Sequence, residues 1–185
     1  KNPPTPTSTP TQTPTTPPTC SLSRSSGVVG SSITVSCGKF RANETVTVYW
    51  DKIGSKSIGS AKADAKGSVK ITVKIPASVA GSHQPIAYGA GSGKSANRTF
   101  KVMPRMAISP TSGYGGASIK VTLTGFSSGE KVAIRWYDVK AKSYKTVKTV
   151  TVSKTGGATA TFKISTGEPK GSHHIRAVGS SHVAT

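Results

Sequence analysis

Acidic residues, leucine and long apolar segments are scarce in this sequence of 185 residues. Six Asp and Glu stand against 25 Lys and Arg, so the formal net charge is +19. No apolar run approaches the roughly eighteen residues that a transmembrane helix needs, and no signal-peptide pattern is visible. The sequence does not begin with Met, and we therefore expect a mature fragment or a processed product.

Where leucine is rare, Val, Thr, Ser, Gly and Lys are common, and this mixture favours strands and turns over helices. Apolar and polar residues alternate within short runs. Ile119, Val121 and Leu123, for example, are separated by Lys120 and Thr122. Each such run ends in Gly, Ser, Pro or Asn. A period of two with these boundaries predicts short strands that have one apolar face.

Two stretches of the sequence are copies of one another. GVVGSSITVSCGKFRANETVTVYW (27–50) aligns with GYGGASIKVTLTGFSSGEKVAIRW (113–136) at a constant offset of 86 residues. Farther along the chain, GSHQPIAYG (81–89) matches GSHHIRAVG (171–179). The matched pairs include Phe40 with Phe126, Glu44 with Glu130, and Trp50 with Trp136.

The repeat predicts two modules, at 20–103 and 104–185, with a boundary near Met103–Arg105. About seven short strands per module, each with an apolar and a polar face, are typical of a β-sandwich. A core Trp on the third strand suits an immunoglobulin-like sandwich. The expected fold is therefore all-β, with two tandem immunoglobulin-like β-sandwich domains after an extended Pro/Thr-rich stalk.

The stretch ISPTSGYGGASIKVTLTGFSSGEKVAIRW (108–136) resembles the opening of the immunoglobulin-like repeats of bacterial secreted and cell-surface proteins. Those repeats typically read S-P-x-S-G-x-x-G and then G-F-x-x-G-E-x-V, with a later G-x-(Y/H)-x-I-x-A strand. The resemblance covers 20–185, and the first copy departs from it, because Arg24 replaces Pro110 and Asn43 replaces Gly129. It implies an extracellular or cell-surface location, but not one particular function.

The first nineteen residues, KNPPTPTSTPTQTPTTPPT, contain nothing that can anchor a core. Proline favours extended polyproline II geometry, so we expect a semi-rigid stalk or linker over 1–19. Such tracts resemble O-glycosylated stalks, and an unmodified linker is the alternative. The candidate sites for O-linked glycans are Thr5, Thr7, Thr9, Thr11, Thr13, Thr15 and Thr16.

The two cysteines fall on apolar positions of the second copy. Cys20 aligns with Met106 and Cys37 with Leu123, on the inward faces of two strands. We prefer a Cys20–Cys37 disulfide to two free thiols, which suits an oxidising extracellular compartment. A loop of this size stabilises by roughly 3 kcal/mol in the entropy model.

Positive charge is shared between the predicted modules. Each has twelve basic and three acidic side chains, which gives +9, and Lys1 supplies the remaining charge. Several lysines crowd the predicted hairpin DVKAKSYKTVK (138–148). We expect this surface to attract anionic glycan, wall polymer, extracellular DNA or an acidic protein, without reading nucleic-acid sequence. Plain solubility is the alternative. The candidate contacts are Lys140, Lys142, Lys145 and Lys148.

Motifs for catalysis, cofactors or metals are weak. GSGKS (91–95) has Tyr88 where a phosphate-binding loop needs Gly. His173 and His174 are neighbours, so on a strand they face opposite ways and cannot readily chelate one ion. We expect His173 on the core face and His174 outside. No enzyme, cofactor or metal site is predicted.

The second module reaches only SSHVAT, so its last strand appears incomplete beside SANRTFKVM of the first. An open sheet edge can accept a strand from a neighbouring chain, which makes self-association into a polymer a hypothesis. The function that we favour is a non-enzymatic structural module of a surface appendage, filament or cell-envelope protein. The alternatives are a basic module that binds anionic polymers and an accessory region of a larger secreted enzyme.

Overall fold

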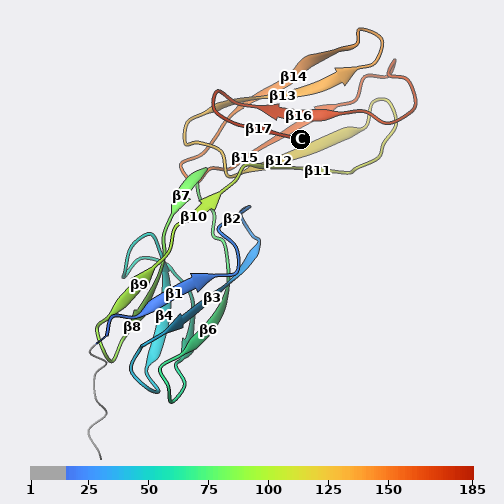
Figure 1. The fold of residues 1–185 in the computed structure, drawn as a ribbon. Helices are drawn as coiled ribbons and strands as arrows, with labels where there is room; N and C mark the ends of the chain where they lie inside the picture. The colour runs from blue at the N-terminus through green and yellow to red at the C-terminus, as the bar shows by residue number, and fades with distance from the viewer. Residues whose placement is uncertain (1–15) are drawn as a thin grey trace, which may run out of the picture. The chain divides into compact units, whose positions relative to one another are not determined.

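The computed structural model describes residues 16–185, which form strands, turns and loops without a helix (Figure 1). The all-β expectation is therefore confirmed, and this part of the chain holds no helix that could cross a membrane. The strands are β1 (Thr19–Leu22), β2 (Ser26–Gly27), β3 (Ser32–Gly38), β4 (Thr45–Trp50), β5 (Ser57–Lys62), β6 (Val69–Lys74), β7 (Gly81–His83), β8 (Pro85–Gly89), β9 (Ser95–Asn97), β10 (Phe100–Val102), β11 (Arg105–Ser109), β12 (Ser118–Thr124), β13 (Lys131–Asp138), β14 (Ser143–Thr151), β15 (Ala158–Lys163), β16 (Ile175–Val178) and β17 (Val183–Ala184).

Strands β1 to β10 form three sheets, in the orders β1-β3-β6, β5-β4-β8-β9 and β2-β10-β7. The pairs β1–β3, β4–β5, β4–β8, β8–β9 and β7–β10 are antiparallel, whereas β10 pairs with β2 in parallel. Thr19, the last residue of the predicted stalk, already belongs to β1 and pairs with Gly38.

Strands β11 to β17 form two further sheets, β11-β12-β15 and β14-β13-β16-β17. The inward side chains of β12 and β15 share one core with those of β13, β16 and β17, so the two sheets pack face to face. Edge strand β14 contributes little to this core, since most of its residues are exposed.

Alternating hydrophobicity accounts for both cores. In β4, Val46, Val48 and Trp50 are buried, whereas the intervening residues are only partly buried. In β13, Val132, Ile134 and Trp136 repeat the pattern. Burial of apolar side chains is the main favourable contribution to folding, so the alternation fixes which face of each strand turns inward.

The described part of the chain divides into two compact units. The first unit holds the described residues up to Ser23, with 33–73 and 84–99. The second holds 24–32, 74–83 and 100–185. The three-stranded sheet of β2, β10 and β7 falls in the second unit.

Candidate functional site

The four lysines predicted to contact an anionic partner lie on one hairpin, formed by β13, β14 and their connection. Lys140 and Lys142 lie in the turn, and Lys142 has a positive φ of 49°. Lys145 and Lys148 lie on β14. We call residues 138–148 the lysine hairpin. All four side chains are exposed, so the structure brings the predicted residues together on one surface.

Strand register decides which way the β14 lysines face. Lys145 pairs with Trp136 and Lys148 with Ile134, on either side of an irregularity in the register. Trp136 and Ile134 both point into the core, so the two lysines share their side of the sheet. Because β14 is an edge strand, the lysine side chains overhang the core instead of entering it.

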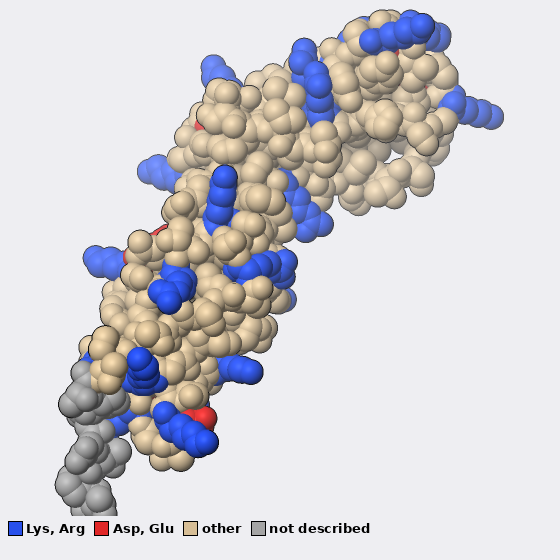
Figure 2. All heavy atoms as spheres, in the orientation of Figure 1, with Lys and Arg blue, Asp and Glu red and all other residues tan. Residues whose placement is uncertain are grey.

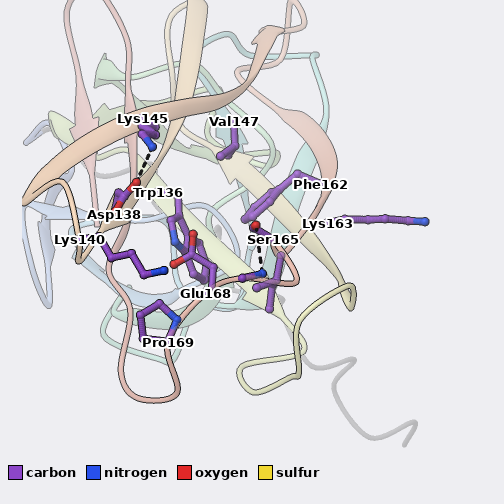
Figure 3. Close-up of a pocket in the computed structure, with 12 residues that line it drawn as sticks. Trp136, Asp138, Lys140, Lys145, Val147, Phe162, Lys163, Ser165, Glu168 and Pro169 are labelled. Carbon is purple, nitrogen blue, oxygen red and sulfur yellow. Dashed lines mark hydrogen bonds and ion pairs between the residues drawn. The ribbon is translucent and has the colours of Figure 1, made fainter.

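A hollow with a volume of about 430 Å³ lies under this overhang, and we call it the Trp136 hollow (Figure 3). Its lining includes Trp136, Phe162, Lys140, Lys145 and Glu168. Figure 3 shows Lys140 extending into the hollow and Lys163 extending away from it. Its lining mixes aromatic and aliphatic side chains with several charged ones, which suits a charged small ligand or a segment of a charged polymer.

The charges of the lysine hairpin are partly balanced within the hairpin itself. Lys145 forms an ion pair with Asp138, and the backbone N–H of Ala141 also donates to Asp138. The hydrogen bond from Lys145 is the main reason that the pKa of Asp138 falls below its ordinary value. The same contact raises the pKa of Lys145. The remaining three lysines are therefore the stronger candidates for an external anion.

The indole of Trp136 stacks on the imidazole of His173, with ring centroids 4.7 Å apart and planes inclined at 25°. His173 Nε2 lies 2.9 Å from the carbonyl oxygen of Pro169. Trp136 Nε1 and His173 Nδ1 are buried without a hydrogen-bond partner. His173 is thus partly buried beside the core and His174 is exposed, as period two predicts. The described residues contain no cluster of side chains suited to a metal ion.

Sequence reasoning missed the role of two buried carboxylates. Glu44 accepts backbone N–H groups of Arg41 at 2.7 Å, Gly91 at 2.9 Å and Ser92 at 2.7 Å. Burial raises the pKa of Glu44, but these hydrogen bonds together outweigh burial and hold the pKa below its ordinary value. We call this arrangement the carboxylate clamp. It fixes the loop between β8 and β9 to the turn before β4.

Glu130 forms the second carboxylate clamp. It accepts the backbone N–H of Ser127 at 3.0 Å and of Ser181 at 2.9 Å. Burial again raises the pKa of Glu130, and the hydrogen bonds from Ser181, Ser127 and His182 outweigh it, so the pKa is lowered. Only 7 % of Glu130 is exposed, and the same fraction of Glu44. The alignment of Glu44 with Glu130 was the available sequence signal, since both occur at the same place in the repeat.

The Sγ atoms of Cys20 and Cys37 form a disulfide between the paired strands β1 and β3. Of the candidate glycosylation sites, Thr16 is exposed. The others, Thr5, Thr7, Thr9, Thr11, Thr13 and Thr15, lie outside the described residues.

Comparison with known proteins shows similarity to solved structures only: no family model and no curated protein matches this chain. One similar structure is the tetra-tandem repeat in the extending region of a large adhesion protein, at 17 % identity and a TM-score of 0.38. That match covers 88 % of this chain and 45 % of the other. Another is the BSP domain of a biofilm associated protein, at 13 % identity and a TM-score of 0.30, covering 91 % and 28 %. Trypsin-activated alpha-2-macroglobulin from Escherichia coli is similar at 13 % identity and a TM-score of 0.34, covering 93 % and 16 %. This chain thus spans less than half the length of each.

The visible surface is dominated by one sign of charge. Figure 2 shows Lys and Arg side chains spread over the face in view, with few Asp and Glu. Two of the six acids, Glu44 and Glu130, are buried in the carboxylate clamps. Fewer carboxylates therefore remain at the surface to offset the lysines than the composition alone suggests.

Proposed function

We propose that the chain is a non-enzymatic structural module of an extracellular or cell-surface protein, built from two tandem immunoglobulin-like β-sandwich domains. The observation that supports a non-enzymatic role is the set of contacts that the six acidic side chains make. Carboxylates are the usual general acids and bases, along with His. Here five of the six accept hydrogen bonds that hold loops or turns, and the sixth, Glu168, lies beside His173.

The two carboxylate clamps account for Glu44 and Glu130, as described above. Asp51 accepts the N–H of Gln84 at 2.7 Å. Two of the remaining three acids accept hydrogen bonds in the same way, and the third approaches a histidine. Asp64 accepts the N–H groups of Lys66 and Ser68, Asp138 holds the hairpin turn and Lys145, and Glu168 lies 3.9 Å from His173 Nδ1. The disulfide supports an oxidising extracellular location for such a module.

Labelling of intact cells of the source organism tests the location. Antibodies against residues 16–185 are expected to label cells without permeabilisation, and external protease should remove the signal. Label seen only after permeabilisation would contradict the proposal. Replacing residues 20–185 in the full-length protein with two unrelated immunoglobulin-like domains tests the structural role. Display of the flanking regions should persist; its loss would show that this chain does more than support them.

The lysine hairpin favours a second function, the binding of an anionic polymer such as an acidic glycan, wall polymer or DNA. Lys140 lines the Trp136 hollow, and Lys142 and Lys148 add exposed charge on the same hairpin. An anionic polymer that binds there releases its counterions, so its affinity should depend strongly on salt concentration. The slope of log affinity against log salt concentration is negative, and each lysine–anion contact that is lost should make it shallower by roughly one unit.

A charge-matched pair of variants tests this function. The first replaces Lys140, Lys142, Lys145 and Lys148 with Gln. The second replaces Lys62, Lys66, Lys70 and Lys74, which are also exposed, with Gln. On immobilised heparin and DNA, the first variant should elute at clearly lower salt than the second. Equal elution of the two would attribute retention to net charge and remove the hairpin as a site.

A further inference from the structure

A groove of about 380 Å³ lies at one end of the sheets formed by β11 to β17. Its apolar walls include Ile108, Ile119, Trp136, Ile164 and Ile175, and residues 110–113 and 171–173 line it as well. Neither of these two segments belongs to a strand. Both expose backbone N–H and C=O groups that a neighbouring strand could pair with.

The equivalent position in the first repeat is filled. Under the repeat alignment, 112–113 corresponds to β2 and 171–173 corresponds to β7. Strand β10 lies between β2 and β7, parallel to the first and antiparallel to the second. Phe100 and Val102 of β10 are almost fully buried, at 0 % and 1 % exposure. An aromatic and a β-branched residue, two positions apart, thus complete this part of the first repeat.

The segments next to this position are less buried in the second repeat than in the first. Ser26 and Gly27 are partly buried, whereas their counterparts Ser112 and Gly113 are exposed. Tyr114, which follows Gly113, is 80 % exposed although it lines an adjoining hollow. No described residue lies in the groove as Phe100 lies beside Gly27.

Two polar atoms in the groove wall are buried without a hydrogen bond. Trp136 is only 8 % exposed, yet its Nε1 has no acceptor. His173 Nδ1 is likewise buried without a hydrogen bond. His173 Nδ1 lies 3.9 Å from Oε2 of Glu168, so these atoms alone do not identify an occupant; the comparison with strand β10 of the first repeat does.

We propose that this groove, which we call the strand groove, binds an extended polypeptide segment from outside residues 1–185. The segment carries an aromatic residue followed two positions later by a β-branched residue. It lies parallel to 112–113 and antiparallel to 171–173, and its aromatic side chain packs against Ile164 and Trp136. Backbone hydrogen bonds give affinity in this mode, and the alternate side chains give specificity. The Pro/Thr tract of 1–19 does not fit, because it has no aromatic residue.

Binding is tested on the full chain with a peptide of sequence NRTFKVMP, which reproduces 97–104. Saturable binding is expected by calorimetry. The amides of Ser112, Gly113 and Ser172 should become protected in hydrogen exchange. A peptide with Ala in place of Phe should bind at least tenfold more weakly. No saturable binding, equal binding of the two peptides or protection elsewhere would overturn the proposal.

A variant that fills the groove provides the second test. A Cβ at Gly113 would lie 3.2 Å from Ala117 Cβ and 3.5 Å from Ile164 Cδ1, so Gly113→Val places a side chain against the groove wall with a small local adjustment at Ala117. It should abolish peptide binding. Gly167→Val is the control, because a Cβ at Gly167 meets nothing within 4 Å. If both variants bind the peptide like the parent, the groove is not the site. A dimer that the peptide fails to dissociate would assign the groove to a second copy of the chain and overturn the proposed occupant.

Discussion

The Nδ1 atom of His182 lies 3.3 Å from Oε2 of Glu130, where it donates to the carboxylate. In the first repeat the corresponding donor is the hydroxyl of Ser92, which lies 2.9 Å from Oε1 of Glu44. Two chemically different side chains thus serve the same carboxylate position. Two backbone donors are equivalent in the repeat, Arg41 with Ser127 and Gly91 with Ser181, whereas Glu44 also accepts the N–H of Ser92. The clamp therefore belongs to the repeat, and its side-chain donor is variable.

Replacement of Glu44 with Gln should destabilise the chain by about 2 kcal/mol at neutral pH, because charged hydrogen bonds are lost and an amide N–H₂ faces N–H donors. The folded-state pKa lies below the ordinary value of 4.5. Ionised Glu44 therefore stabilises the fold above about pH 4.5, and this contribution is lost as the pH falls through the folded-state pKa. Denaturant unfolding between pH 7 and pH 3 measures the difference, which should shrink towards acid.

Asp138→Asn is the matched control for that experiment, since Asp138 pairs with the exposed Lys145 at the surface. Its effect at neutral pH should be clearly smaller than that of Glu44→Gln. A Glu44→Gln effect that stays constant across the pH range would show that the carboxylate charge is unimportant.

Gly179 and Glu130 should be energetically coupled. A Cβ on Gly179 would lie within 3 Å of the Glu130 carboxylate, so Gly179→Ala must displace a side chain that its hydrogen bonds hold in place. We expect a loss of about 2 kcal/mol in the free energy of unfolding. In a Glu130→Ala background the same change should cost much less. Additive losses in this double-mutant cycle would refute the coupling.

A side chain at Gly67 should cost much stability. Its φ is +75°, and a Cβ would lie only 2.1 Å from the carbonyl oxygen of Phe40. Gly67→Ala should therefore cost about 3 kcal/mol, from the backbone conformation and the displaced carbonyl together. Gly54 has a similar φ of +82° with nothing within 4 Å of its Cβ position, so Gly54→Ala should cost only about 1 kcal/mol. Thermal or denaturant unfolding measures the loss of stability in both variants. Equal losses would show that the contact with Phe40 is irrelevant.

Loss of the disulfide should lower stability without changing the fold. The double variant Cys20→Ser, Cys37→Ser removes a link across 17 residues and should cost about 3 kcal/mol. Reduction of the parent chain should give a similar loss, and reduction should leave the double variant unaffected. A parent that unfolds at the same denaturant concentration with and without reductant would contradict this expectation.

The alternation of apolar and polar residues was sufficient to predict strands and the burial of Trp50 and Trp136, because it shows directly which face of a strand is apolar. Pairing Cys20 with Cys37 needed only the repeat. The carboxylate clamps were not predictable in this way. Glu44 accepts from Ser92, 48 residues away, and neither periodicity nor composition records such a contact.

The lysine hairpin shows a second limit. The sequence located its lysines, but it did not reveal that Lys145 and Lys148 share the inward side of the sheet. That orientation depends on the register shift between Ile134 and Arg135, which leaves one extra residue on β14. The Trp136 hollow beneath them depends in turn on β14 being an edge strand.

The Cys20–Cys37 disulfide has a consequence for mechanical load. Cys20 and Cys37 are direct partners in the β1–β3 register. A force that pulls on the chain at Thr19 is therefore transmitted covalently into β3 after one residue, without first peeling β1 away. If load reaches the chain through the residues before β1, the junction of those residues with β1 is then not the weakest point under tension.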